Sequence, residues 1–442
     1  MDAVSKGNQA AESFIRPKIL LASTMPWASG ARLAIGLSRV GCQISALCAS
    51  KDPLRKTSAV DQIFPYSGFR PLRSVTAAIE VSCPQVVVPC DDRAVHHLHE
   101  LYKFRPSDAI AALIERSLGH PDSYPIAAAR YSLLEVAREE GLRVADTSII
   151  KSGEDLSAWC DREPFPCVLK ADNTFGGYGV RVASNLAQAQ RHFSELRRLF
   201  AGKNAFRHLI VDGDTFWLRP WLKRRQSTVI IQRFIQGTPA NCAVVCWQGR
   251  ILAGISVKVL RTYGPNQPAT IVRLVNNREM TLAAERIAGR LRLSGFFGLD
   301  FILENRTGEP YLIEMNPRCT PPCHLALGQG RDLARALSAQ VSGQEMQMFP
   351  AVTNNDVIAY FPGAANSETK LLEACFYDIP QGETELVQEL LQAFQQRSLL
   401  RRARRYLRSK TRSTKASWGP QAETVDVEKV SSAIWSTQLD QP

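Results

Sequence analysis

The hydrophobic positions of the first hundred residues fall into short runs that are separated by helix-like stretches. Apolar runs at 18–22, 43–48 and 85–89 predict strands, and residues 31–40 have the pattern of a helix. Strands that alternate with helices indicate a parallel sheet. We therefore expect a parallel α/β unit over residues 17–106, with any ligand at the carboxyl ends of its strands.

Two of these strand ends carry small or polar residues. Ser23, Thr24, Ser29 and Gly30 follow the first strand, and the pair at 91–92 follows the run at 85–89. One of the two aspartates suits the N-cap or first turn of a helix, where a carboxylate accepts from free backbone N–H groups. For the other aspartate, the helix start and a ligand contact both remain open.

A pair of apolar segments in the third quarter of the chain predicts a hairpin. Residues 298–302 and 311–318 flank a polar stretch that contains a Thr-Gly pair. Alternation places Asp300 on one face of the first strand, and Glu314 with Asn316 on one face of the second. Two carboxylates and an amide oxygen suit a hard cation such as Mg²⁺, or Mn²⁺ in its place. The hairpin therefore predicts a metal site.

The same hairpin carries a cation beside the predicted metal. Arg318 lies two residues beyond Asn316 and falls on the same side, where it can meet phosphate oxygens. A surface hairpin with solvated acids is the alternative, and it suits Glu304 and Glu309. It does not suit Glu314, which interrupts an apolar strand. Acids, an amide and an Arg beside a metal indicate phosphoryl transfer.

A glycine-rich hairpin upstream offers the phosphate half of such a site. The apolar run 167–170 ends in Lys170, and a strand resumes at 180–183 after a loop rich in glycine. The glycines let backbone N–H groups approach phosphate oxygens, and the Lys supplies a point charge. The pattern is neither a dinucleotide fingerprint nor a Walker loop. An ordinary hairpin with a chance Lys is the alternative. The glycines are Gly176, Gly177 and Gly179.

The order of these parts resembles the ATP-grasp superfamily over roughly residues 107–341. Between the hairpins, the apolar strand and connector at 227–237 match the family's adenine hinge, where a Glu is commoner than the Gln seen here. The resemblance implies that the phosphates are bound by Lys170 and by the loop of Gly176, Gly177 and Gly179. It implies that adenine is bound by Gln232, Arg233, Phe234 and Ile235. It also implies that magnesium is bound by Asp300, Glu314 and Asn316, and that Arg318 contacts phosphate or substrate.

Some candidate site residues differ from those that the family usually has, or have no named counterpart in the family's pattern. Arg130 stands where many members have a phosphate-binding Lys, and a surface Arg at a helix start is the alternative. Asn241 stands where a ribose-binding acid is often found. Arg273, a charge within an apolar strand, is expected to face the γ-phosphate or the acyl group. His324 is either a structural loop residue or a contact to the acceptor or phosphate.

The expected fold class combines α/β and α+β. A Rossmann-like parallel-sheet domain at 17–106 precedes a two-lobed ATP-grasp domain at 107–345, whose lid spans about 147–225. Residues 346–442 form a C-terminal extension with a further strand at 356–362 and a long helical pattern at 383–406 that becomes basic.

Composition restricts the class of protein without identifying it. The 442 residues are 45% hydrophobic and 22% charged, which is ordinary for a globular chain, and no apolar run approaches the length of a membrane span. The N-terminal residues have no secretory pattern, so we expect a cytoplasmic protein. The 11 cysteines show no framework spacing, so reduced thiols are expected and a zinc site is disfavoured.

Basic residues concentrate near the C-terminus. The segment 397–415 holds nine Lys or Arg and no acid, and without it the net charge of +12 falls to +3. A solvated basic helix is favoured over one that binds an anionic membrane or nucleic acid. Weak contact with an anionic surface, and a homodimer, stay open as partners.

The combined features predict an ATP-dependent ligase with small-molecule carboxylate and amine substrates. The carboxylate would attack the γ-phosphorus of MgATP to give an acylphosphate. An amine, or less favourably a thiol, would then attack the acylphosphate and displace phosphate. Carboxyphosphate or carbamoyl-phosphate chemistry on the same fold is one alternative. A non-catalytic nucleotide-binding module is another, and the presence of all three metal ligands argues against it.

Overall fold

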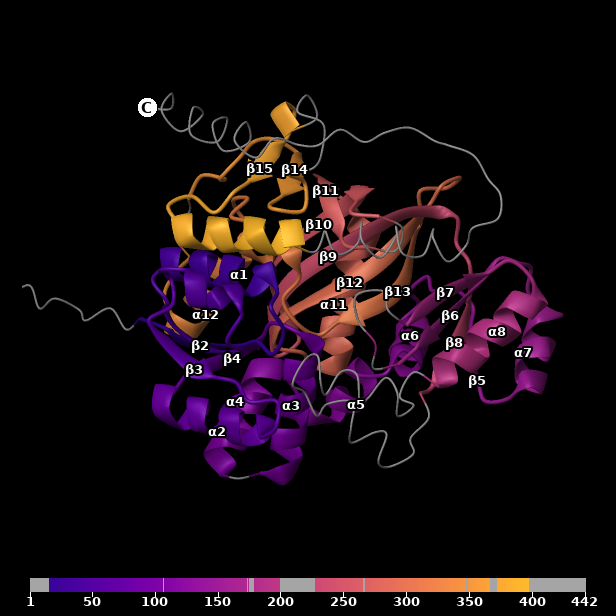
Figure 1. Cartoon of the computed structure of the whole chain (residues 1–442), viewed down its shortest axis with the longest axis horizontal. Coiled ribbons are helices and arrows are strands. Elements are labelled where there is room, and N and C mark those ends of the chain that lie inside the picture. Colours follow the sequence, from indigo (N-terminus) through magenta and orange to yellow (C-terminus); the bar gives the residue numbers. More distant parts are fainter. Residues whose placement is uncertain are drawn as a thin grey trace, which may run out of the picture.

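A computed structural model describes residues 16–105, 107–172, 174, 179–198, 227–264, 267–346, 349–365 and 372–396. Within these residues the chain forms three β-sheets with helices packed around them (Figure 1). The first sheet belongs to an N-terminal unit, another forms a small lobe, and the longest lies between them. Among the described helices, none combines the length and the hydropathy that crossing a membrane requires.

The N-terminal unit is built on a four-stranded parallel sheet in the order β3-β2-β1-β4. Its β1 strand is buried at every position after Lys18, as expected for a strand that is covered by helices on both faces. The expected parallel α/β unit is confirmed. Its elements are β1 (Lys18–Ala22), α1 (Ala28–Arg39), β2 (Gln43–Cys48), η1 (Pro53–Lys56), β3 (Gln62–Pro65), α2 (Pro71–Ser82), β4 (Val86–Pro89), α3 (Asp92–Phe104) and α4 (Asp108–Leu118).

Side-chain caps start the two helices that lead out of this unit. The Asp91 carboxylate accepts from the backbone N–H of Ala94 at the start of α3, and the Ser107 hydroxyl accepts from Ile110 at the start of α4. The Asp91 cap also places Asp92, the first residue of α3, just beyond the carboxyl end of β4.

A short linker and a small antiparallel lobe follow. The lobe's sheet has the order β5-β8-β6-β7, and two helices pack on it through Leu156, Trp159 and Phe193. The expected hairpin around Lys170 is present as β6 and β7. The elements are η2 (Pro121–Ser123), α5 (Tyr124–Ala127), α6 (Arg130–Glu139), β5 (Thr147–Ile150), α7 (Gly153–Cys160), β6 (Cys167–Ala171), β7 (Val180–Ala183), α8 (Leu186–Arg197) and β8 (Val229–Arg233).

The central sheet has seven described strands in the order β13-β12-β9-β10-β11-β14-β15. One face packs against α11 and α6, and the other packs against the N-terminal unit, η3 and α12 (Figure 1). The expected metal hairpin is the antiparallel pair of β12 and β13. The elements are β9 (Gly237–Trp247), β10 (Arg250–Thr262), β11 (Ala269–Leu274), α11 (Arg278–Leu291), β12 (Gly295–Glu304), β13 (Pro310–Asn316), η3 (Pro321–His324), α12 (Leu333–Ser342), β14 (Val357–Tyr360) and β15 (Phe376–Asp378).

The C-terminal region is joined to the central sheet instead of standing apart from it. β14 pairs with β11, with Ile358 opposite Val272, and β15 pairs with β14. Residues 384–396 are helical and bury Leu386 and Leu390 in the core. This differs from the expected division at residue 346, because β11 presents a free edge that β14 satisfies. The remainder of the helical pattern and the basic segment lie outside the described residues.

Candidate active site

A row of side chains crosses the central sheet at the predicted metal site. In the strand registers Glu314 lies opposite Asp300, Asp300 opposite Asn241, and Asn241 opposite Val257. Residues directly opposite each other in neighbouring strands project from the same face. The row therefore runs from acid to amide to apolar side chain on the face that packs against the N-terminal unit.

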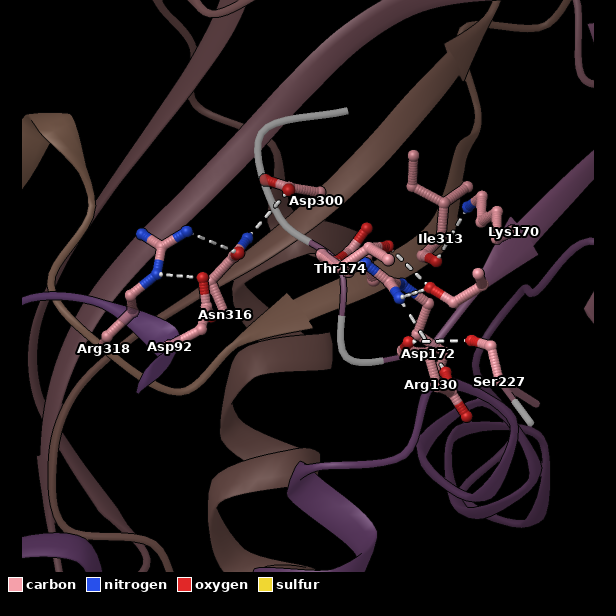
Figure 2. Close-up of polar contacts among 12 residues, drawn as sticks. Asp92, Arg130, Lys170, Asp172, Thr174, Ser227, Asp300, Ile313, Asn316 and Arg318 are labelled. Carbon is pink, nitrogen blue, oxygen red and sulfur yellow. Dashed lines mark hydrogen bonds and ion pairs between the residues drawn. The ribbon is translucent and has the colours of Figure 1, made fainter. Parts of the chain in front are cut away.

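Asp300 of this row accepts hydrogen bonds from two amides, and Figure 2 shows the one from Asn316. Asn241 Nδ2 donates to Asp300 Oδ1 at 2.6 Å, and Asn316 Nδ2 donates to Asp300 Oδ2 at 2.8 Å. Burial and the nearby charge of Glu314 raise the pKa of Asp300 to about 6, and the two amides oppose this rise. The structure thus brings Asp300, Glu314 and Asn316 together as the sequence predicted.

Arg318 connects this group to the N-terminal unit. Its Nη2 donates to Asn316 Oδ1 at 3.1 Å, its Nε lies 3.0 Å from Asp92 Oδ2 in an ion pair, and its guanidinium lies 5.4 Å from the centre of the Trp27 ring (Figure 2). The sequence left open whether one of the two aspartates at 91–92 contacts a ligand. In the structure Asp91 caps helix α3, and Asp92 contacts Arg318. Figure 2 shows Asp92, Arg318, Asn316 and Asp300 as one connected chain of polar groups.

Arg130 links the small lobe to the metal hairpin. Its Nη2 donates to Glu314 Oε1 and to Thr174 O, both at 2.8 Å, and its Nη1 donates to Ala171 O at 2.6 Å. The carboxylate of Asp172 lies 3.8 Å away. Burial alone would raise the pKa of Glu314, but the charges of Arg130 and Lys170 outweigh it and lower that pKa. The Arg130 side chain, which is 10% exposed, thus lies mostly buried between the lobe and the hairpin and is not a surface Arg.

Lys170 lies at the end of β6, facing β13. It is 5% exposed, and its Nζ donates to Ile313 O at 3.3 Å (Figure 2). Burial lowers its pKa to about 8, although the charge of Glu314 opposes the shift. Gly179 passes so close to Thr174 that a Cβ there would lie 2.1 Å from the Thr174 Oγ1. Gly176 and Gly177 lie outside the described residues.

A cavity of about 340 Å³ opens over this face of the sheet. Gly298, which lies opposite Asn316, allows the chain after β13 to fold back over the sheet, since a Cβ there would lie 2.6 Å from Thr320 Cγ2. The cavity walls contain Arg130, Thr174, Asn241, Asp300, Glu314, Asn316 and Arg318 from the polar group, and Trp27, Val257, Val259, Val272, Pro321, Pro322 and Tyr360 from apolar segments.

The predicted adenine hinge is the connection between the lobe and the central sheet. β8 ends at Arg233 and β9 begins at Gly237, with Phe234 and Ile235 between them. Gln232 is buried and its Nε2 donates to Thr147 Oγ1 at 3.0 Å. Arg233 pairs with Asp146 at 3.5 Å, and Phe234 is exposed. These four residues do not line the cavity described above.

Two other predicted residues lie away from the cavity. Arg273 is half-exposed and pairs with Asp356 at 3.3 Å, on the face of β11 opposite to Val272. His324 is buried, with its Nε2 2.7 Å from Asp378 Oδ2. No group of three or more His, Cys, Asp or Glu that could hold a metal occurs among the described residues, so a site at the acids would need the Asn316 amide as a ligand.

Several residues of the cavity carried no recognisable signal in the sequence. Trp27 lies in the turn after β1, where the sequence analysis named Ser23, Thr24, Ser29 and Gly30 but not Trp27. Tyr360 comes from β14, which was expected in a separate extension. The partnership of Asp92 with Arg318 joins positions more than two hundred residues apart, and only the assembled fold reveals it.

Comparisons with known proteins agree with this geometry. Residues 154–322 match the family model of the ATP-grasp domain. The biotin carboxylase domain of the Hydrogenobacter thermophilus 2-oxoglutarate carboxylase, solved with MgADP, ADP and bicarbonate, aligns with a TM-score of 0.53 at 16% identity, covering 76% of this chain and 71% of that one. The N5-carboxyaminoimidazole synthetase of Staphylococcus aureus, solved with ADP, aligns with a TM-score of 0.52 at 12% identity, covering 76% and 80%.

Curated relatives match at low identity. The carbamoyl phosphate synthase large chain of Pseudomonas putida is 24% identical over 257 residues, which is 57% of this chain and 23% of that protein. The D-alanine–D-alanine ligase of Christiangramia forsetii is 22% identical over 198 residues, or 42% of this chain and 52% of that protein. The chain thus spans between a quarter and about half of the relatives' length. The predicted resemblance and fold class are confirmed, with the ATP-grasp domain model matching residues 154–322.

Proposed function

We propose that the protein is an ATP-dependent ligase that activates a carboxylate for attack by an amine. The observation that carries the proposal is the convergence of Asp300, Glu314, Asn316 and Arg130 at one cavity, with Lys170 hydrogen-bonded to Ile313 of the same hairpin. Partly buried acids, an amide oxygen and largely buried cations together suit a magnesium nucleotide, in which the metal and the phosphates are both charged.

The residues present fit a magnesium ion. Asp300 and Glu314 offer carboxylate oxygens and Asn316 an amide oxygen, and all three lie on one sheet face with no thiol or imidazole among them. Both Asp300 oxygens currently accept N–H groups from amides, so the position already attracts positive charge. When bound, Mg²⁺ or Mn²⁺ would neutralise phosphate oxygens and hold them in place.

The remaining roles follow from position and charge. Lys170, Arg130 and the loop of Gly176, Gly177 and Gly179 would hold the phosphates. Gln232, Arg233, Phe234 and Ile235 would hold adenine at the connection between the two lobes, with Asn241 near the ribose. Arg130 now forms three hydrogen bonds that join the lobe to the metal hairpin, so its planar guanidinium suits a contact that bridges several oxygens.

The chemistry is phosphoryl transfer to an acid. A carboxylate oxygen of the substrate attacks the γ-phosphorus, the bond to ADP breaks, and an acylphosphate forms. An amine then attacks the acyl carbon, loses a proton, and displaces inorganic phosphate. Arg318 would stabilise the negative charge that develops on the substrate side. Catalysis of this kind depends on positioning and electrostatics more than on covalent chemistry by the protein.

Bicarbonate is a second candidate for the acid. It is favoured by the neighbour that was solved with bicarbonate and by the match to carbamoyl phosphate synthase. The two candidates differ in a simple measurement. Phosphate release that requires bicarbonate but no organic acid indicates carboxyphosphate chemistry, whereas release that requires an organic acid indicates the ligase. A homodimer, as in the neighbouring carboxylase domain dimer, can be tested by light scattering in the same preparation.

Substitution of Glu314 by Gln tests the proposed site. The change keeps the side-chain volume but removes a charge that the metal would need, so we expect phosphate release to fall roughly 100-fold. Glu309→Gln is the matched control, because Glu309 lies in the same hairpin and pairs with Arg143 on the surface. Turnover of Glu314→Gln within threefold of the wild type at saturating magnesium contradicts the metal assignment.

A further inference from the structure

The cavity has two chemically different ends on one sheet face. The polar end holds the acids and amides of β12, β13 and β9. The other end is mainly apolar: Val257 and Val259 come from β10, Val272 from β11 and the ring of Tyr360 from β14, while Gln267 and the Tyr360 hydroxyl are the neutral polar groups there. These side chains share a face by register, because Val259 lies opposite Val272, Val272 lies opposite Ile358, and Tyr360 is two residues beyond Ile358.

A second wall closes over this apolar floor. Trp27 reaches it from the start of α1 in the N-terminal unit, and Pro321 with Pro322 reach it from the segment after β13. We call the space between this wall and the valine floor the apolar chamber. Arg318 also lines the cavity, and it contacts both Asn316 at the polar end and the Trp27 ring of the chamber wall.

Arg318 is held in position with donors to spare. Its ion pair with Asp92 and its hydrogen bonds to Asn316 Oδ1 and Cys319 O orient the guanidinium. A guanidinium has two N–H groups on each Nη. Among the described residues, each Nη of Arg318 donates one hydrogen bond. A second N–H on each remains for an anion. Arg318 therefore offers a carboxylate a fixed, partly buried cation beside the apolar chamber.

We propose that the apolar chamber selects the carboxylate substrate, and that this substrate is a small monocarboxylic acid with an apolar body. The inference rests on the proposed ligase function. The acid group meets Arg318 next to the metal ligands, and the body lies on Val257, Val259 and Val272 beneath Trp27. A second charged group on the body would lie against the valines, where no cation among the described residues lines the cavity, so dicarboxylic acids are disfavoured.

Direct binding tests the chamber without turnover. Acetate, propionate, butyrate and isovalerate are titrated calorimetrically into the full-length protein in the presence of MgADP, with malonate and succinate as polar comparisons. We expect the affinity to rise about fourfold with each added CH₂ group until the chamber is full, because each group leaves water for an apolar surface. Malonate and succinate should bind at least tenfold more weakly than butyrate.

Two variants test whether the dependence of affinity on chain length comes from the apolar chamber. Val259→Thr adds a hydroxyl to the chamber floor at constant shape and should reduce the gain per CH₂ to less than twofold. Trp27→Ala removes the opposite wall and should weaken isovalerate at least tenfold while acetate changes less than threefold. Val81→Thr, an exposed position on α2, is the matched control and should bind like the wild type. MgADP affinity of each variant, measured separately, should be unchanged.

The outcomes separate this inference from the ligase proposal. If affinity is independent of chain length, or if Val259→Thr and Trp27→Ala leave the series unchanged, the chamber assignment is overturned even when some other acid supports phosphate release. A bicarbonate-dependent activity that no organic acid alters also overturns it. If the series behaves as expected but these acids stimulate no phosphate release, the chamber stands as a binding site and the ligase proposal fails.

Discussion

At the scale of single residues, the site is organised by buried charges of opposite sign. Glu314 lies close to Arg130 and is influenced by Lys170, and the two cations together lower its pKa despite burial. Lys170 in turn has a lowered pKa because burial outweighs the attraction of Glu314. Glu314 and Arg130 form a direct ion pair, so each offsets the cost of burying the other. Phosphate oxygens entering beside Lys170 would add the negative charge that this arrangement lacks.

Lys170→Met should weaken nucleotide binding without unfolding the protein. The substitution keeps the apolar stem in a buried position but removes the cation proposed to contact phosphate. A hydrogen bond to a charged group contributes roughly 1.5–3 kcal/mol, so the Kd of MgATP should rise about 10- to 150-fold by calorimetry. Lys258→Met is the matched control, since Lys258 stands on the opposite face of β10 from Val257. Equal nucleotide affinity in both variants would remove Lys170 from the phosphate site.

At the scale of elements, the strands after residue 350 complete the cavity and connect it to the N-terminal unit. β14 supplies Tyr360, and β15 supplies Asp378, which is paired in register with Tyr360. Buried Asp378 contacts Arg32 of α1 and His324 of η3. Three segments that are far apart in the chain therefore meet at one buried carboxylate. It links the C-terminal strands to α1 of the N-terminal unit and to η3.

Asp378→Asn should destabilise the fold by roughly 3–5 kcal/mol at pH 7, because it leaves the Arg32 cation buried without its partner. Burial opposes ionisation of Asp378, but His324 and Arg32 outweigh it and lower its pKa. A lowered pKa means that the ionised carboxylate stabilises the fold above its ordinary value near 4, and that this contribution is lost as pH falls below that value. Urea unfolding at pH 7 and at a pH well below 4 measures both effects.

The matched control for this element is Asp356→Asn. Asp356 forms an exposed ion pair with Arg273, so its loss should change stability by less than about 1 kcal/mol at either pH. If the two substitutions cost the same, the carboxylate of Asp378 does not hold the C-terminal strands, and their packing depends on apolar contacts alone.

At the scale of the whole molecule, the sequence was informative where a property is local. Apolar runs predicted β1, β6 and β12, and alternation placed Asp300 and Glu314 correctly, because side-chain direction within a strand follows from position alone. Contacts between distant segments were not predictable. The direction of Arg273 depended on how β11 pairs with β10, and a shift of one residue reverses a strand's faces.

The same limit explains the boundary at residue 346. Composition changes there, so a separate extension was expected, but a strand's sequence does not reveal which edge it will join. β14 completes the sheet at β11, and Leu386 and Leu390 of the following helical segment enter the core at 0% and 5% exposure. The sequence predicted the helical pattern of this segment, but the residues that it packs against could be identified only in the assembled sheet.

Two truncations test which C-terminal residues the folded, nucleotide-binding protein needs. A cut after Gln396 retains every residue placed in the site and the helical segment, including Phe394, whose ring lies 5.1 Å from that of Tyr263. It removes ten basic and four acidic residues, which lowers the net charge from +12 to +6. We expect unchanged nucleotide affinity and thermal stability. Binding to anionic vesicles, if the full chain shows any, should weaken and lose its salt dependence.

A cut after Gln381 should behave differently, because it also removes Leu386 and Leu390. Burying a Leu side chain contributes about 1.5–3 kcal/mol, so losing both should cost roughly 3–6 kcal/mol and lower the melting temperature measurably. Differential scanning calorimetry and MgADP titration on both truncations make the comparison. If the cut after Gln396 already unfolds the protein or abolishes nucleotide binding, the basic segment belongs to the folded core or the site. In that case its proposed role as a peripheral, charge-dependent surface is wrong.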